Sequence, residues 1–589
     1  MSLTPLRRAF TAAALALLPL PAVAAGVQSL DQGWSPADRT AFYTTSQGSR
    51  MMPLAWFQAL ERPSSQELFL TDSLALYGYL PNGGPGTLPI GFTIDSKAPG
   101  PTSVGMTCSA CHTGQIDYKG QSLRIDGAPA DADFGRFLRD VTDALAQTQT
   151  DGQKWNRFAG RVLGAKRNAA SEKQLKADFE AFAARWTPFM NGSLPKDHWG
   201  PSRLDAFGMI FNRLTSLDVG MPQNLQPAAA PVSYPFLWNT HAQTMVQWNG
   251  AGPSGSYLKA MLRNVGEVIG VFADWSLYEF PNGQLGIKTS ADFKGLQSLE
   301  EKLAALKSPL WPAGVLGPID QAKAARGQVL YQQECASCHA VLAQRPPVKP
   351  FKIQTYDVGT DPAVVVASGR IVETGKLGSG LLPYAGMHLP PKAPATQMLA
   401  KGVIGSVLAP FSPGSHTVRG SKIAILHAAE LDLENGLRRR LPWKDQTPSA
   451  ADLVAELKDA YGLSAADYGV AATSAPAAGG APAWTPPARN PAIKYESRPL
   501  NGIWATAPYL HNGSVPNLYE LLLPVAQRSS TFAVGKREFD PMRVGFVTGP
   551  MDGAVFDVSK PGSSNAGHEY GGTLSEVDRQ ALLEYLKSL

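Results

Sequence analysis

Every cysteine of the chain falls in one of two short segments with the same pattern. Residues 108–112 read CSACH and residues 335–339 read CASCH, so two residues separate each pair of thiols and a histidine follows at once. Thiols at this spacing can add to the two vinyl groups of one haem, and the adjoining imidazole can then bind its iron. The chain is therefore expected to carry two covalently bound c-type haems, attached through Cys108, Cys111, His112, Cys335, Cys338 and His339.

Other uses of paired cysteines fit the pattern less well. A CxxC pair can bind zinc or work as a redox dithiol, and four cysteines in an exported protein can form two disulfides. Here the motif occurs twice, each copy has its own histidine, and the two copies use all four cysteines. These features favour haem attachment.

Further iron ligands must come from the other histidines or from methionine. Between residues 113 and 189 there is neither His nor Met, so no strong sixth ligand follows the first motif closely. This absence favours an open or weakly ligated first haem that can meet O2 or H2O2. For the second haem, His511 and His568 are both candidates, and two imidazoles on one iron form a low-spin haem suited to electron transfer.

The segments that must position these groups are predicted to be mostly helical. Residues 130–147, 171–187 and 291–307 repeat apolar side chains with a helical period, and another helix is expected to lead into the second motif. The chain ends in a helix with Ser575 as its N-cap and an apolar stripe of Val577, Ala581, Leu582, Tyr585, Leu586 and Leu589. Because strand signals are few, the expected fold is mainly α, with two cytochrome c-like haem domains and long loop extensions.

Composition indicates the domain boundaries and the location of the protein. Residues 1–25 combine two arginines, a short apolar stretch and small residues, which is typical of a secretory signal peptide. We expect an N-terminal haem domain over 26–310, a C-terminal one over 311–589 and a flexible linker at 471–490. Because of the predicted signal peptide, we expect the protein to be periplasmic or secreted. No stretch is long and apolar enough to span a membrane, and the basic residues are too dispersed to indicate nucleic-acid binding.

Four places in the chain resemble the bacterial diheme cytochrome c peroxidase superfamily, which includes the diheme enzyme MauG and the rubber oxygenases. The first is the pair of haem motifs, whose CSACH and CASCH variants are similar to those of the rubber-oxygenase branch. The second, residues 502–518, reads GIWATAPYLHNGSVPNL and resembles the superfamily signature TAPYxH(D/N)GSVxxL. The third is the loop before the last helix, which contains His568. The fourth is QWNG at 247–250 followed by RNVGEV at 263–268, which resembles a WDG segment followed by NPxEM.

The resemblance implies roles for individual residues. In this superfamily the sixth ligand of the second haem lies shortly before the last helix, which favours His568 over His511. A tryptophan between the haems relays electrons, and a glutamate in the distal pocket of the first haem is the acid/base for O–O cleavage; these roles fall to Trp248 and Glu267. Phe272 would form an apolar wall of the same pocket. In the plainer interpretation Trp248 and Phe272 are core aromatics and Glu267 is a carboxylate on a helix surface.

With this resemblance, the sequence predicts an exported haem-dependent oxidoreductase, either a dioxygenase or a peroxidase. The chain lacks the histidine that peroxidases place soon after the first haem motif, and it is longer than simple diheme peroxidases. Both departures favour an always-open first haem that uses O2 or H2O2 to oxygenate a large apolar alkene. One alternative is a peroxidase that reduces H2O2 with an electron-transfer protein, and another is a non-catalytic diheme electron carrier. Related peroxidases also hold calcium, although no ligand set for calcium stands out here.

Overall fold

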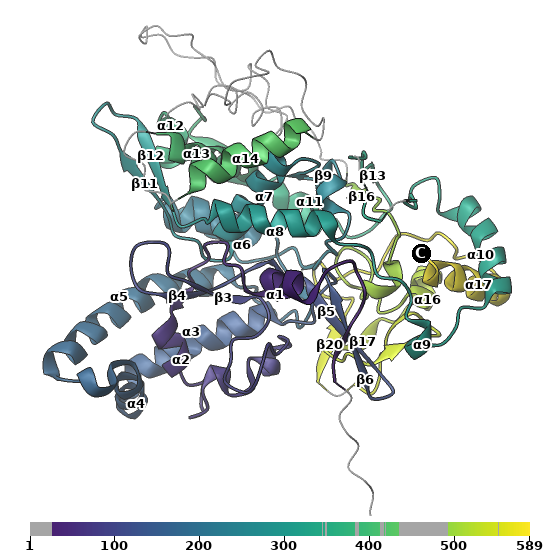
Figure 1. Ribbon diagram of the computed structural model, residues 1–589, viewed down its shortest axis with the longest axis horizontal. Helices are drawn as coiled ribbons and strands as arrows, with labels where there is room; N and C mark the ends of the chain where they lie inside the picture. Colours follow the sequence, from purple (N-terminus) through teal and green to yellow (C-terminus); the bar gives the residue numbers. More distant parts are fainter. Residues whose placement is uncertain are drawn as a thin grey trace, which may run out of the picture.

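Short strands alternate with helices along the chain. The structure, a computed structural model, describes residues 26–343, 345–347, 350–382, 388–412, 418, 420–434, 493–551 and 553–589. Within these residues the strands pair into separate sheets of two or three (Figure 1). The fold is therefore mixed α/β, and the expectation of a mainly α fold is wrong. Most strands are too short to show an alternating pattern in the sequence, since each has only two to six residues.

Two segments predicted from the sequence lie outside the described residues. These are the signal peptide at 1–25 and the linker at 471–490. In the part of the chain that is described, no helix has both the length and the apolar character needed to cross a membrane.

Two small sheets flank the first CxxCH motif. One has the strand order β2-β4-β3, and its strand β4 ends at Met106. The other has the order β1-β6-β5, and its strand β5 begins at Thr113. The motif thus connects the end of one sheet to the start of the next through a single 3-10 turn. The strands are β1 (Gln28–Ser29), β2 (Met52–Pro53), β3 (Phe92–Asp95), β4 (Ser103–Met106), β5 (Thr113–Tyr118) and β6 (Gln121–Asp126).

Three helices follow these sheets and lie at the lower left of Figure 1: α3 (Phe134–Thr150), α4 (Gly152–Leu163) and α5 (Ala169–Ser193). They confirm the helices expected over 130–147 and 171–187. The side chain of Asp133 accepts a hydrogen bond from the first turn of α3, and Asn168 does the same for α5, which fixes where each helix begins. Their apolar faces belong to an aromatic cluster that includes Trp56, Phe69 and Phe92, with Phe137 fully buried within it.

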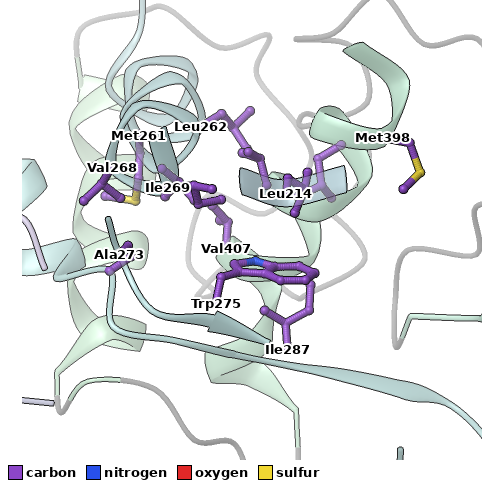
Figure 2. Packing of buried hydrophobic residues seen from close by; sticks show 14 of the residues in the cluster. Leu214, Met261, Leu262, Val268, Ile269, Ala273, Trp275, Ile287, Met398 and Val407 are labelled. Carbon is purple, nitrogen blue, oxygen red and sulfur yellow. The ribbon is translucent and has the colours of Figure 1, made fainter. Parts of the chain in front are cut away.

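A second layer surrounds an apolar core that Figure 2 shows from close by. Helix α7 packs in it against α8, α13 and α14, and α8 confirms the helix expected over 291–307. The α7 side chains Met261, Leu262, Val268 and Ile269 are buried there with Trp275, whose indole N–H donates to Ser406 Oγ at 2.9 Å. The bounds are α7 (Tyr257–Gly270), β11 (Trp275–Glu279), β12 (Leu285–Thr289), α8 (Phe293–Ala305), α13 (Ala395–Leu408) and α14 (Ser421–Glu434).

Helices α10 (Gln321–Glu334) and α17 (Glu576–Lys587) lie side by side at the right of Figure 1. Helix α10 ends at the second CxxCH motif, as expected. The helices cross at Gly327, where a Cβ atom would lie 2.0 Å from the carbonyl oxygen of Ala581, so this close approach needs glycine. Ser575 caps α17 as expected. Val577 does not belong to the buried stripe, because it is 70% exposed.

The remaining elements are short and connect these layers. The helices are α1 (Pro36–Thr44), α2 (Leu54–Ala59), α6 (Gly208–Phe211), α9 (Ala313–Leu316), α11 (Ala363–Ser368), α12 (Gly375–Ser379) and α16 (Leu518–Leu521). The paired strands are β7 (Arg203–Leu204) with β8 (Val232–Ser233), β9 (Met245–Val246) with β10 (Gly252–Pro253), β13 (Thr355–Tyr356) with β16 (Tyr495–Glu496), β14 (Ile371–Glu373) with β15 (Lys392–Pro394), β17 (Thr531–Val534) with β20 (Ala554–Asp557), and β18 (Phe539–Asp540) with β19 (Gly545–Phe546).

Candidate haem sites

The first CxxCH motif lies on the wall of a cavity of about 210 Å³, which Cys108, Cys111 and His112 all line. The Nδ1 atom of His112 lies 2.8 Å from the carbonyl oxygen of Pro235. A hydrogen bond there makes Nδ1 the donor and leaves Nε2 as the atom that can bind a metal. Burial lowers the pKa of His112 to about 4, so that the imidazole is neutral, as a metal ligand must be.

Two of the residues assigned by resemblance line the same cavity. Glu267 projects from α7, on the side away from the apolar core, and burial raises the pKa of its carboxyl group. Its Oε1 atom lies 3.5 Å from the amide nitrogen of Gln247 and 3.9 Å from Nε of Arg263. Trp248 donates its indole N–H to the carbonyl oxygen of Ser233 at 2.9 Å. These positions allow the assigned roles, which stay predictions.

Phe272 does not reach either cavity. Its ring is buried and packs on Trp186, with 5.2 Å between ring centroids, and the guanidinium of Arg213 lies 5.9 Å from the ring. The structure therefore places Phe272 in the aromatic core rather than on the wall of the first cavity.

The second CxxCH motif lines a separate cavity of about 180 Å³. Its proximal histidine repeats the arrangement of the first, because Nδ1 of His339 lies 2.9 Å from the carbonyl oxygen of Arg498 and Nε2 remains available. Tyr331 at the end of α10 donates its hydroxyl to the carbonyl oxygen of His339 at 2.7 Å. The helix and the motif are thus fixed to each other directly.

Both candidate sixth ligands line the second cavity, but only His568 is paired with the proximal ring. The ring centroids of His339 and His568 are 6.1 Å apart. Imidazoles on opposite sides of one metal ion would have centroids about 6 Å apart, because this distance spans two metal–nitrogen bonds of about 2 Å each and the radius of each ring. His511 instead stacks on Tyr495 with a centroid distance of 4.1 Å. The spacing of His339 and His568 fits an iron held between them.

An unusual backbone presents His568 to the cavity. His568 has φ +49° and the preceding Gly567 has φ +76°, both in the left-handed region. Five backbone carbonyl oxygens converge on the guanidinium of Arg528, and three belong to the loop itself: Asn565, Gly567 and His568, at 2.7, 2.8 and 3.0 Å. Arg528 could not be identified from the sequence, because it contacts backbone atoms of a distant segment and no motif marks such a contact.

Other uses of the cysteines find no support in the described residues. None of the four cysteines forms a disulfide. No group of three or more His, Cys, Asp or Glu side chains in the described part of the chain could hold a metal ion. The buried imidazoles and paired thiols of the two cavities are suited to haem c.

Comparison with known proteins adds one domain assignment and two relatives. Residues 494–533 match the family model described as RoxA-like, cytochrome c-like, which supports the rubber-oxygenase-like branch and implies haem c. The chain is 30% identical to the uncharacterized protein y4iJ of Sinorhizobium fredii over 95% of this chain and 93% of that protein. It is 24% identical to the uncharacterized protein y4iM of the same organism, over 67% of this chain and 73% of that one.

The match also corrects the expectation of two cytochrome c-like domains, since only one is detected. The architecture gives the physical reason. A helix, α10, leads into the second motif, whereas strands precede and follow the first motif. The first motif therefore lies between two strands and has no helix leading directly into it.

Proposed function

The chain belongs to the family of the Sinorhizobium fredii protein y4iJ, and for this member we propose the function of an exported haem-dependent oxidoreductase with one haem c in each cavity. The observation that carries this proposal is the inequality of the two cavities. In the second, His568 faces His339 at a spacing that fits a shared iron. In the first, the other described histidine of the lining is His198, and the carboxylate of Asp133 holds its Nε2 at 3.0 Å.

This inequality supports a division of labour. A haem with an open coordination position supplies activation of O2 or H2O2, which protein side chains cannot supply. In the first cavity, His112 would hold that group and the carboxyl of Glu267 would accept or donate a proton. His339 and His568 would fix a six-coordinate electron-transfer group in the second cavity. Trp248 lines both cavities and would couple them.

The lining of the first cavity favours oxygenation of an apolar alkene. Its lining combines polar and charged side chains with apolar ones, among them Phe134, Leu194, Met209, Ile210 and Val271. A hydrocarbon chain placed there would bury apolar surface at about 25 cal/mol per Å². Peroxide reduction with an electron-donor protein is the second candidate, and the carboxyl group of Glu267 in the same cavity favours it.

The test uses the purified holoprotein and begins with the number of haems per chain. Oxygenation predicts that O2 is consumed together with an alkene substrate and that carbonyl products form. Peroxide reduction predicts that H2O2 is consumed together with a reduced small cytochrome. If both haems are low-spin and their spectra do not change on addition of O2, CO or H2O2, both enzymatic proposals are wrong and an electron carrier is the remaining function.

A further inference from the structure

A single wall separates the two cavities. The residues that line both are Ser233, Tyr234, Trp248, Glu496 and Arg498. Within this set, only Glu496 and Arg498 carry ionisable groups that can be charged at neutral pH. Any charged group bound near the wall in either cavity therefore meets these two side chains.

Arg498 is buried in this wall with most of its hydrogen-bonding capacity unused. Its residue is only 5% exposed. A guanidinium has five N–H donors, and within the described residues one of them finds an acceptor, the carbonyl oxygen of Phe236 at 2.8 Å from Nη2. The Nε atom is buried without a partner. The guanidinium also stacks on the ring of Phe236 at 3.9 Å and lies 5.9 Å from that of Trp248.

The neighbouring carboxyl group of Glu496 compensates the charge of the Arg498 guanidinium poorly. The nearest oxygen of Glu496 lies 3.9 Å from Nε, which is too long for a hydrogen bond, and the other oxygen has no partner in the part of the chain that the structure describes. Among the described residues, the guanidinium of Arg498 thus has no carboxylate within hydrogen-bonding distance, and a buried charged group is costly unless it is paired.

We propose that Arg498 binds carboxylates in both cavities, as a shared anchor for the carboxylate groups of the two haems. The inference rests on the proposed function, because haem c carries two propionates and each cavity would contain one haem. A guanidinium matches a carboxylate with two parallel N–H donors, so one side chain can serve carboxylates on either side of the wall. Its backbone carbonyl meanwhile accepts from His339, so Arg498 contacts the second site twice.

The test compares reduction potentials in the full-length holoprotein without added substrate, so that only resident carboxylates contribute. Arg498→Gln removes a positive charge beside both haems, which favours the oxidised state of each. Both midpoint potentials should fall, each by about 59 mV, a tenfold change for a one-electron couple. Arg498→Lys should recover most of the shift. The control is Arg50→Gln, a buried arginine paired with Asp95 and Asp274 that lines neither cavity and should leave both potentials unchanged.

The outcomes separate this inference from the proposed function. Two haems in the wild type, with a shift at one of them or at neither, would overturn the shared anchor and leave the two-haem proposal intact. One haem in the wild type would overturn both. If Arg498→Gln does not fold, resonance Raman spectra of Arg498→Lys decide, because carboxylate bending bands report on hydrogen bonding at each haem. Bands unchanged at either haem would contradict the proposal.

Discussion

At the scale of single residues, the two candidate haem sites differ in what faces the histidine of each CxxCH motif. His339 has a second imidazole across the cavity, whereas His112 has the aromatic ring of Tyr234 as its ring neighbour, 6.3 Å away. An iron with two imidazoles is saturated, and an iron with one can take a small molecule. The chemistry of the protein is therefore expected to depend on a few side chains.

Replacing His568 by alanine removes the proposed sixth ligand of the second haem. In His568→Ala that haem should change from low-spin to high-spin while the first stays as it was, and electron paramagnetic resonance resolves the two. His511→Ala is the matched control, since His511 lines the same cavity but stacks on Tyr495. If only the His511 variant becomes high-spin, our choice of ligand is wrong.

Replacing Glu267 by glutamine removes the proposed proton carrier without changing the size of the side chain. General acid/base groups contribute about 100- to 10,000-fold in rate, so Glu267→Gln should slow the reaction with H2O2 by a factor in this range. Stopped-flow absorbance measures the rate, and the resting haem spectra should be unchanged. Glu180→Gln, on the exposed face of α5, is the control. An unaltered rate would leave Glu267 as a structural carboxyl group only.

At the scale of elements, the second site depends on the crossing of α10 and α17. Gly327→Ala places a Cβ atom 2.0 Å from the Ala581 carbonyl oxygen and forces the helices apart. Overpacking of this kind costs about 1–3 kcal/mol, so the urea unfolding midpoint should fall. Gly152→Ala, at an open position on α4, should be neutral or slightly stabilising. Equal midpoints for both variants would mean that the crossing can relax freely.

The loop that contains His568 depends in turn on its contacts with Arg528. Arg528→Met keeps the length of the side chain but leaves five carbonyl oxygens without their donor, which costs a few kcal/mol. Part of the second haem should become high-spin as the loop moves, and Arg528→Lys should restore part of the low-spin signal. Arg543→Met is the control, because Arg543 contacts Glu520 and not the loop. A fully low-spin second haem in Arg528→Met would show that the loop keeps its conformation without Arg528.

The sequence predicted the helices well, but not the sheets or the supporting arginines, and haem attachment at the two CxxCH motifs stays a prediction. A helix such as α3 or α5 repeats its pattern over several turns, and CxxCH is contiguous, so both can be read locally. The pairing of β1 with β6 joins residues almost a hundred positions apart and leaves no local pattern. Arg498 and Arg528 contact backbone atoms of distant segments, so their importance becomes visible only in the folded chain.

At the scale of the whole molecule, the two parts of the chain complete each other's sites. The first motif lies in the N-terminal part, yet Glu496 and Arg498 from the C-terminal part line its cavity. In return, Ser233 and Trp248 line the cavity of the second motif. The stability of one part therefore affects both sites. A buried charge in the second layer, around the core of Figure 2, is expected to affect the stability of the whole fold.

Lys401 on α13 is that charge, because its residue is fully buried and its ammonium donates to the carbonyl oxygens of Gly378 and Gly380 at 2.9 and 2.8 Å. Burial lowers its pKa from 10.5 to about 7. Between these values the unfolded chain binds a proton that the folded chain does not, so stability rises with pH through this window.

Urea unfolding should therefore show that, relative to Lys401→Met, the wild type gains about 2–3 kcal/mol between pH 7 and pH 9.5, at about 1.4 kcal/mol per pKa unit. Lys401→Met keeps an apolar side chain of similar size at this position and removes the titrating group, so its stability should change much less over the same range. Lys376→Met, an exposed lysine on the neighbouring helix α12, should keep the pH dependence of the wild type. The same dependence in all three proteins would mean that Lys401 stays protonated in the folded chain.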